Sequence, residues 1–464
     1  MKIFNTLSRQ KEELIPIEEG KLRIYACGPT VYNYIHIGNA RPLCVFDVLR
    51  RYLEWRGWQV TFAQNFTDID DKLIRRAQEE NTTVPELAAR YIEEFWTDAR
   101  GLNVRQATVH PKATENIDEI QALIAQLVEK GYAYPAGGDV YFRAHTFAQY
   151  GKLSHQPLEE LEAGARVGIG EQKESPADFA LWKAAKEGEP FWESPWGKGR
   201  PGWHIECSAM ARRYLGQTID IHCGGQDLIF PHHENEIAQS ECANGCEFAH
   251  YWMHNGYINV DNRKMSKSLG NFFTVRDVAA KVGYEPIRYL MISSHYRSPI
   301  NYSADILEQG VRALERLYHC RDGVEFAAKN APAEWQEGEQ QTLETMSRRR
   351  EQFIRAMEDD LNTADALAAV FELAREINTA VAASPSKPLC DAMESLFQEL
   401  CDVLGLLYVD KNASLDDEIE AMIAARSAAR KNRDFAEADR IRDELKARGI
   451  VLEDTAQGVK WHRE

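Results

Sequence analysis

No stretch of this sequence approaches the roughly 20 consecutive apolar residues that a membrane-spanning helix needs. The first residues also lack the charged and apolar regions of a signal peptide. We therefore expect a soluble, cytoplasmic protein without a membrane partner. Internal repeats and low-complexity tracts are absent as well, which excludes repeat solenoids and favours ordinary globular domains.

Cysteines are few and irregularly placed. The 464 residues contain 9 of them, an odd number with no even spacing. This pattern argues against a disulfide framework. It favours a reducing compartment with free or metal-bound thiols.

Cations are also scarce, because 55 Lys and Arg face 72 Asp and Glu and the net charge is -17. Such an acidic chain is not expected to bind nucleic acid over its whole surface, since contacts to phosphate need cations. Residues 421–464 depart from the trend, with ten Lys and Arg against eight Asp and Glu, a local charge of +2. The distribution of charge matters more than its sum, so a nucleic-acid partner remains open for this segment.

Apolar residues make up 44% of the chain, enough for the cores of two to four domains. Strand-like and helix-like patterns alternate at 22–27, 42–55, 59–65 and 71–79. They return later as strands at 218–222 and 257–260 and a helix that begins at Pro231. This alternation predicts an α/β protein with a doubly wound, Rossmann-like parallel sheet.

The remaining segments predict further domains. Residues 132–143 indicate a hairpin around Gly137-Gly138, and residues 144–200 are irregular and rich in Gly, Pro and Trp. Helices are expected at 303–320, 340–358, 364–382 and 390–405. The predicted division is a first half of the Rossmann-like domain (1–143), an inserted connective segment (144–200), a second half (201–302), a helical bundle (303–409), a polar linker (410–417) and a small C-terminal domain (418–464).

Two short motifs carry the chemistry. His36-Ile37-Gly38-Asn39 lies at a predicted strand-to-helix turn, where Gly38 lets a ligand approach the backbone and the helix N-terminus favours phosphate. Lys264-Met265-Ser266-Lys267-Ser268 follows a predicted strand and forms a loop with two ammonium groups, suited to a triphosphate. In this order, the two motifs indicate activation of a carboxylate by ATP.

These motifs resemble the two signatures of class I aminoacyl-tRNA synthetases, and their surroundings narrow the match to bacterial-type cysteinyl-tRNA synthetases. The further matching segments are Tyr25-Ala26-Cys27-Gly28-Pro29-Thr30-Val31-Tyr32, Asn65-Phe66-Thr67-Asp68-Ile69-Asp70-Asp71-Lys72, Pro201-Gly202-Trp203-His204-Ile205-Glu206-Cys207 and Phe230-Pro231-His232-His233-Glu234-Asn235-Glu236. The resemblance covers nearly the whole chain. One departure is Asn39, where many similar proteins have histidine; asparagine loses the titratable ring.

The resemblance implies ligation of L-cysteine to tRNA(Cys) through a cysteinyl-adenylate, with ATP and Mg²⁺ as substrate. It assigns catalytic roles to His36, Asn39, Lys264 and Lys267. It assigns ATP contacts to Thr30, His36, Gly38, Gly224, Gly225, Asp227 and Lys267, and cysteine contacts to Thr67, Trp203 and Asp227. From the residues alone, His36 could instead cap a helix, Trp203 could belong to a core, and Gly224-Gly225-Gln226-Asp227 could be an ordinary turn.

A metal site is predicted from four residues. His232 and Glu236 share one helix face because they lie four positions apart. Cys27 ends a predicted strand and Cys207 begins a predicted helix, so both could meet at the carboxyl edge of the sheet. On spacing alone, the two thiols could equally be ordinary buried cysteines. The resemblance, which matches all four positions, implies that they hold one Zn²⁺ per chain.

Three other cysteines are assigned no ligand role. Cys242 and Cys246 lie four positions apart but have no third partner nearby in sequence, so we interpret them as structural. Cys223 stands where similar proteins often have glycine, and we expect it near the metal without ligating it.

Basic and aromatic residues recur near the C-terminus, a composition suited to single-stranded bases. The alternative is a solvated helical hairpin with no ligand. The resemblance places an anticodon-binding domain here and implies tRNA contacts from Arg426, Arg430, Arg433, Phe435 and Trp461. We expect a monomer.

Two other functions would account for part of these motifs. A cysteine ligase that passes the adenylate to an amino sugar would share the ATP and zinc motifs but should lack the tail at 418–464. A non-enzymatic tRNA-binding paralogue would be expected to lose the Lys-Met-Ser-Lys-Ser loop or the cysteines, and both are present.

Overall fold

The computed structural model describes residues 1–158, 172–261, 263–264, 273–409, 416–431, 434–447, 449–455 and 458–463. They fall into two compact units. The first comprises Met1–Arg312, Phe353–Leu367 and Val403–Leu406, and the second comprises Ala313–Gln352, Ala368–Asp402 and Leu407–Glu464. Across the described ranges, every helix is too short or too polar to cross a lipid bilayer.

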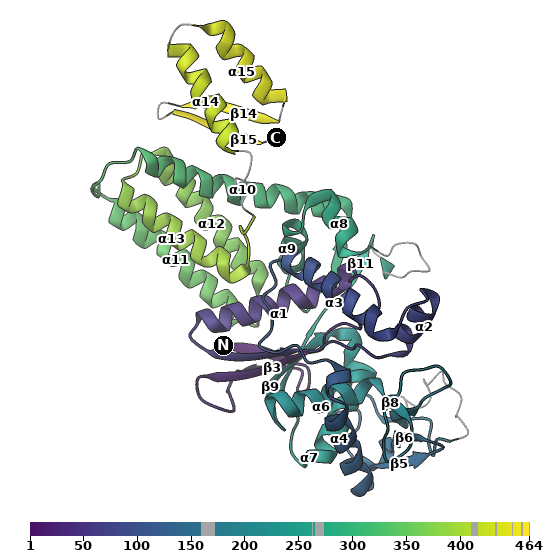
Figure 1. The fold of residues 1–464 in the computed structure, drawn as a ribbon. Coiled ribbons are helices and arrows are strands. Elements are labelled where there is room, and N and C mark those ends of the chain that lie inside the picture. The colour runs from purple at the N-terminus through teal and green to yellow at the C-terminus, as the bar shows by residue number, and fades with distance from the viewer. Residues whose placement is uncertain are drawn as a thin grey trace. The chain divides into compact units, whose positions relative to one another are not determined.

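A four-stranded parallel sheet forms the centre of the first unit (Figure 1). Its strands, in spatial order, are β10 (Ala249–Asn255), β9 (Ile219–Gly225), β3 (Lys21–Ala26) and β4 (Gln59–Gln64). Helix α1 (Ile37–Trp55) connects β3 to β4, whereas α7 (Glu234–Asn244) connects β9 to β10 in the opposite direction. Right-handed crossovers therefore place the two helices on opposite faces. The predicted doubly wound α/β fold is confirmed, although its strand at 249–255 was not predicted and the predicted strand at 257–260 belongs to another sheet.

Helix α1 begins five residues before the predicted start at residue 42. The backbone becomes helical directly after His36, whose N–H donates to the side-chain oxygen of Asn39 at 3.1 Å. Pro42 lies inside the helix rather than at its start. The cap therefore determines the start of the helix, and the motif His36-Ile37-Gly38-Asn39 forms its first turn.

A second sheet combines the predicted hairpin with two strands from the segment that we expected to be irregular. It is antiparallel and joins β5 (Ala133–Ala136), β6 (Asp139–Phe142), β7 (Phe179–Ala184) and β8 (Gly199–Pro201) in that order. Gly137 and Gly138 form the predicted hairpin turn at φ values of 61° and 89°, which favour glycine. Strands β6 and β7 lie on opposite sides of the predicted domain boundary at residue 143. Because they pair, this boundary divides a single sheet.

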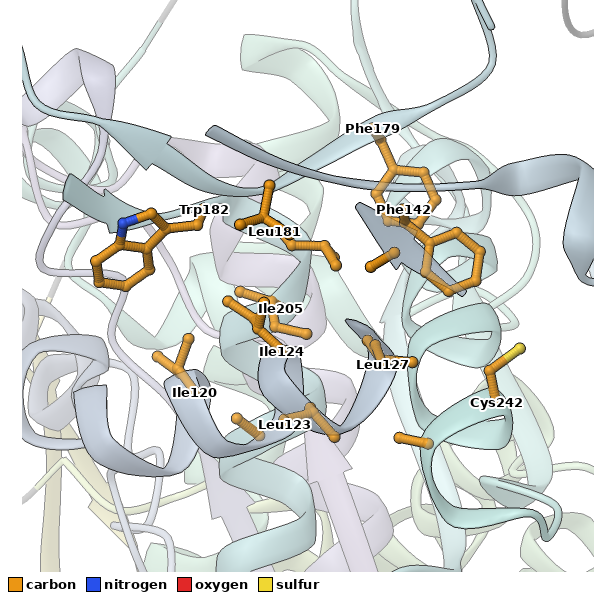
Figure 2. Packing of buried hydrophobic residues seen from close by; sticks show 14 of the residues in the cluster. Ile120, Leu123, Ile124, Leu127, Phe142, Phe179, Leu181, Trp182, Ile205 and Cys242 are labelled. Atoms are coloured by element: carbon orange, nitrogen blue, oxygen red, sulfur yellow. The ribbon is translucent and has the colours of Figure 1, made fainter. Parts of the chain in front are cut away.

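A buried apolar cluster joins this second sheet to three helices (Figure 2). Leu181 and Trp182 of β7 contribute from the sheet, and Ile124 contributes from α4 (Ile117–Glu129). The other two helices are α6 (Trp203–Leu215) and α7, which contribute Ile205 and Cys242. Cys242 thus has the structural role that we predicted, and the cluster fixes the two helices that carry Cys207 and Glu236.

In the described part of the first unit, five further strands and four further helices lie outside these two sheets and their crossover helices. The strands are β1 (Lys2–Asn5), β2 (Gln10–Glu13), β11 (Ile258–Val260), β12 (Arg263–Lys264) and β13 (Ile300–Tyr302). The helices are α2 (Asp71–Glu79), α3 (Val84–Gly101), α8 (Val275–Val282) and α9 (Glu285–Ile292). Strand β11 pairs with β12 on one side and with β13 on the other.

Four long helices follow the strands: α10 (Ala304–Lys329), α11 (Glu339–Glu358), α12 (Thr363–Ala382) and α13 (Lys387–Leu404). The first extends nine residues beyond the predicted end at 320, because Cys320, Val324 and Ala327 continue its buried face.

The C-terminal segment has a small core of its own. It contains α14 (Asp416–Lys431), α15 (Phe435–Ala447), β14 (Ile450–Thr455) and β15 (Gly458–Arg463), and the two strands form an antiparallel pair. Ile423, Ile441, Leu445 and Ile450 pack together inside it. Most of the predicted linker, 410–415, lies outside the described residues, and Asp416 already belongs to α14.

Candidate nucleotide and metal-binding site

The carboxyl ends of three parallel strands gather the predicted site residues. Cys27 follows β3, Asn65 follows β4, and Gly224 and Gly225 end β9. The connections leave the sheet in opposite directions from β3 and β9, so this edge is a topological switch point. Ligands of open α/β sheets bind at such points.

Backbone hydrogen bonds join the first signature motif to the segment at 273–275, which follows the second motif in the sequence. The N–H of Ile37 donates to the carbonyl of Phe273 at 3.1 Å, and the N–H of Val275 donates to the carbonyl of Ile35 at 3.0 Å. His36 is bridged to Thr274 in the same pairing. Residues 273–275, which follow the second motif, thus lie against the first motif, although more than 230 positions separate the two segments.

The structure describes only part of the second motif. Residues 265–272, which include Lys267, lie outside the described ranges. Lys264 ends the short strand β12, which places its backbone beside β11. The predicted roles of both lysines stay predictions.

Asn39 has a clear structural role. Its side-chain oxygen holds the N–H of His36 at 3.1 Å, which fixes the turn from which α1 starts. An amide suffices for this contact, so the departure from histidine at this position leaves the helix start intact.

Glycines at this edge allow close approach of neighbouring groups. A Cβ atom on Gly28 would lie 1.6 Å from the carbonyl oxygen of Asn65, and one on Gly224 would lie 2.6 Å from the His233 ring. A Cβ on Gly225 would lie 2.4 Å from a carboxylate oxygen of Asp227, which is itself exposed. The packing therefore leaves no room for a side chain at Gly28 or Gly224. The turn after Gly225 leaves Asp227 accessible to a ligand.

The four predicted metal ligands lie together. Ligand atoms of Cys27, Cys207, His232 and Glu236 are all within 4.8 Å of one another. The two sulfurs are 3.8 Å apart, and Cys27 Sγ lies 3.5 Å from Glu236 Oε1. His232 Nε2 lies 3.0 Å from the same oxygen. A donor set of two thiols, one imidazole and one carboxylate fits Zn²⁺, which prefers sulfur and nitrogen ligands in a tetrahedral arrangement.

A group of buried histidines surrounds these donors, and our reading of the sequence did not predict it. His222 Nε2 lies 2.8 Å from Glu236 Oε2, and His204 Nδ1 lies 2.9 Å from His232 Nδ1. His233 Nε2 lies 3.3 Å from Cys27 Sγ. Cys27, His222, His233 and Glu236 could form a second donor set within the same distance limit. It offers one thiol instead of two, so the predicted set suits zinc better.

Mutual contacts set the protonation of the cluster. Burial, followed by contact with Cys207, raises the pKa of the Cys27 thiol. The hydrogen bond from Cys27 lowers the pKa of Cys207 to about 6 against the effect of burial. Burial also acts to raise the pKa of Glu236, but the imidazoles of His222 and His232 bring it to about 2. The cluster thus concentrates thiolate and carboxylate charge that a divalent cation would neutralise.

The predicted cysteine contacts line the approach to this cluster. Trp203 is 39% exposed and stacks on His232, with ring centroids 4.3 Å apart, so it is not a core residue. Thr67 is buried and donates its hydroxyl to Glu206 Oε2 at 2.9 Å. Its backbone pairs with Thr30. Glu206 is a neighbour that the sequence did not single out.

The predicted tRNA contacts have different positions. Phe435 is 62% exposed and Arg430 is exposed, as nucleic-acid contacts require. Arg426 is only 6% exposed because it shares a helix face with the core residue Ile423. Such burial is unfavourable for a phosphate contact, and the predicted role of Arg426 stays a prediction. Arg433 lies outside the described residues, and only the backbone of Trp461 is described, in register with Leu452.

Comparison with family models divides the chain into three segments. Residues 13–312 match the tRNA synthetases class I (C) catalytic domain. Residues 352–408 match the DALR domain, and residues 412–461 match the cysteinyl-tRNA ligase anticodon binding domain.

Relatives match over the full length. The chain is 57% identical to the cysteine--tRNA ligase of Caldicellulosiruptor saccharolyticus over 465 residues, covering 100% of both proteins. It is 55% identical to that of Clostridioides difficile over 464 residues, again covering 100% of both.

Solved structures of similar fold are more distant in sequence. Mycobacterium tuberculosis methionyl-tRNA synthetase in complex with methionyl-adenylate matches at a TM-score of 0.60 and 17% identity, covering 83% of this chain and 89% of that one. An Agrobacterium radiobacter leucyl-tRNA synthetase complex matches at 0.61 and 11% identity, covering 85% of each chain. At such identities, the likeness concerns the fold alone.

Proposed function

The chain belongs to the cysteinyl-tRNA synthetase family, and we propose that the sheet edge around Cys27 and Cys207 is where it activates cysteine. It is a cysteine–tRNA ligase: cysteine and ATP give cysteinyl-adenylate and pyrophosphate, and the cysteinyl group then passes to tRNA(Cys). Two observations support the site assignment: the pairing of 35–37 with 273–275 and the four-residue donor cluster at the carboxyl ends of the strands.

In the first step, the carboxylate of cysteine attacks the α-phosphorus of ATP. We assign His36 and Lys267, with Lys264, to the negative charge that develops on the phosphates. Gly38 lies in the first turn of α1, so backbone N–H groups of that turn face the phosphates. Thr30, Gly224, Gly225 and Asp227 border the nucleotide. Mg²⁺ enters with ATP.

Cys27, Cys207, His232 and Glu236 would hold one zinc ion. When bound, the ion supplies a Lewis acid that binds thiolate far better than hydroxyl. The chain's own groups orient the ligands: His222 holds Glu236, and His204 holds His232. Thr67 and Trp203 would form the walls of the amino-acid pocket.

The alternative of an amino-sugar acceptor is not favoured. Full-length relatives are cysteine–tRNA ligases, and the segment that such a ligase should lack is present and matches an anticodon-binding model. We propose that the enzyme acts as a monomer in the cytoplasm.

ATP–pyrophosphate exchange with each amino acid in turn tests the function. We expect exchange with cysteine and, because the thiolate is selected, negligible exchange with serine. Exchange that depends equally on serine, or on another amino acid, would contradict the assignment.

We further propose that residues 418–464 read the tRNA anticodon, with contacts from Arg430, Arg433, Phe435 and Trp461. Each stacked base is then worth about 1–3 kcal/mol, and salt should weaken the complex. A chain that ends at Ala413 should keep exchange near the intact rate but lose most of its aminoacylation efficiency through weaker tRNA binding. Phe435→Ala should show a milder form of the same division.

Two outcomes would disprove this role of the tail. Loss of exchange on truncation would make the tail part of the catalytic fold. Unchanged aminoacylation would show that the tail does not contribute to tRNA binding.

A further inference from the structure

The corner between α11 and α12 contains a buried carboxylate that the proposed function does not use. Asp360 has no exposed surface, whereas its neighbour Asp359 is exposed and pairs with Lys11 at 2.7 Å. Asp360 and Leu361 adopt φ values of 63° and 49°, a left-handed conformation that is uncommon for residues other than glycine. Such a conformation at two consecutive residues persists only where the surroundings fix it.

Four groups point to the Asp360 carboxylate. One oxygen accepts from the N–H of Phe4 at 2.7 Å and from the phenol of Tyr296 at 2.8 Å. The other pairs with the guanidinium of Arg297 at 2.8 Å and lies 3.4 Å from His295 Nε2. Burial acts to raise the pKa of Asp360, but these contacts outweigh it and lower the pKa. Three consecutive residues, 295–297, are therefore fixed by one carboxylate.

Helix α1, which begins within the first signature motif, also holds this segment. Arg41 of α1 is fully buried, and its guanidinium donates to the carbonyls of Gly256 at 3.0 Å, Tyr257 at 3.1 Å and His295 at 3.2 Å. Gly256 also donates its N–H to the carbonyl of Tyr296 at 2.8 Å. A Cβ on Gly256 would lie 2.6 Å from the carbonyl oxygen of Arg297, so there is no slack in this packing.

From this segment, backbone pairing leads to the second signature motif. Residues 300–302 form β13, which pairs with β11, and β11 pairs with β12, where Lys264 lies. The N–H of Ile300 donates to the carbonyl of Tyr257 at 2.9 Å, close to the carbonyls that Arg41 holds. Gln226, next to the nucleotide-turn residue Asp227, reaches the carbonyl of Arg297 at 3.5 Å. The turn next to Asp227 thus contacts the segment that Asp360 fixes, and the strand that contains Lys264 is connected to the same segment through β11 and β13.

We propose that Asp360 is a positioning residue for ATP. It acts through residues 295–298 and the β13–β11–β12 pairing on the backbone of Lys264. This inference rests on the proposed function, because that function assigns Lys264 to the nucleotide. Cysteine binding should depend on Asp360 much less, because the metal ligands lie on other elements: the end of β3, helix α6 and the start of α7.

Steady-state ATP–pyrophosphate exchange by the full chain tests the proposal. Asp360→Asn keeps the shape but removes the charge, and a displacement of about 1 Å can cost up to about 100-fold. We expect kcat to fall and the KM for ATP to rise, so that kcat/KM for ATP falls about 10- to 100-fold. The KM for cysteine and the zinc content should change little. Asp359→Asn, the exposed neighbour, should leave every parameter within about twofold.

A second pair of variants keeps the test decisive if Asp360→Asn does not fold. Tyr296→Phe removes one hydroxyl that donates to Asp360, and Tyr134→Phe removes one that donates to the buried Asp178 at 2.8 Å. Both should lower thermal stability, but only Tyr296→Phe should raise the KM for ATP.

Equal changes in the KM for ATP and cysteine, or equal effects of the two tyrosine variants, would overturn the positioning role. Failure of the proposed function would be seen separately, as absence of cysteine-dependent exchange by the unmodified chain.

Discussion

Replacing Cys207 by serine is expected to remove zinc and most of the preference for cysteine over serine. Cys207 is buried with its sulfur 3.8 Å from that of Cys27, and its pKa is lowered to about 6, so it enters the site as a thiolate. A serine hydroxyl does not ionise near neutral pH and is a poor zinc ligand. Elemental analysis should find one zinc per unmodified chain and much less in the variant.

The size of the effect follows from the similarity of the two amino acids. A pocket that distinguishes them by size alone provides roughly 1–3 kcal/mol, or about 10- to 200-fold. Translation requires discrimination on the order of 10⁴. Loss of the metal should therefore return selectivity for cysteine over serine to the lower range, a loss of about 50-fold or more. The KM for ATP should change far less than the KM for cysteine.

Cys246→Ser is the matched control, because Cys246 is exposed and belongs to neither donor set. It should keep zinc, selectivity and exchange. X-ray absorption at the zinc edge should also show an added sulfur neighbour when cysteine binds to the unmodified chain. A preparation that is free of metal and still fully active and selective would refute the zinc site.

Removing either His36 or Lys267 is expected to lower the rate of exchange by about 10²–10³. Preorganised donors stabilise the charge that develops on phosphate in the transition state, and loss of one typically costs about 2.7–4 kcal/mol. His36 lies at the start of α1, where it pairs with Thr274, a residue that follows the second motif in the sequence. The decrease should be in kcat as well as kcat/KM, because the contact strengthens as the reaction proceeds.

His250→Ala and Lys281→Ala serve as controls of the same residue types. Lys281 is an exposed residue in α8, and the His250 side chain is partly exposed on β10. Both should retain exchange within about twofold. Circular dichroism should show all four variants folded. Near-normal exchange in folded His36→Ala and Lys267→Ala would remove the assignment of these residues to ATP.

Features that depend on local spacing could be predicted from the sequence. Alternating strand and helix patterns predicted three of the four strands of the parallel sheet. The interval between His232 and Glu236 predicted that their side chains meet, and they do at 3.0 Å, although His232 lies just before α7. The two glycines at 137 and 138 predicted a hairpin turn, which the backbone confirms. Periodicity and turn chemistry act over a few residues, so they can be recognised without the fold.

Contacts between residues far apart in the sequence could be recognised only in the folded structure. Cys27 and Cys207 are 180 positions apart, and their approach follows from the order of the strands, to which local patterns are insensitive. Strands β7 and β8 of the second sheet were missed because they are short and follow long irregular connections. Arg426 carries a charge that suggested a surface contact, yet the helix phase places it beside a core.

The buried polar contacts show the same limit most clearly. His222 and Asp360 look like ordinary polar residues in the sequence, and nothing nearby in the chain indicates their partners. His222 meets Glu236 from a neighbouring element, and Asp360 meets Phe4 across 356 positions. A buried polar group must find a partner wherever the fold brings one within reach. Because that partner is supplied by long-range packing and not by local propensity, the three-dimensional structure alone decided these contacts.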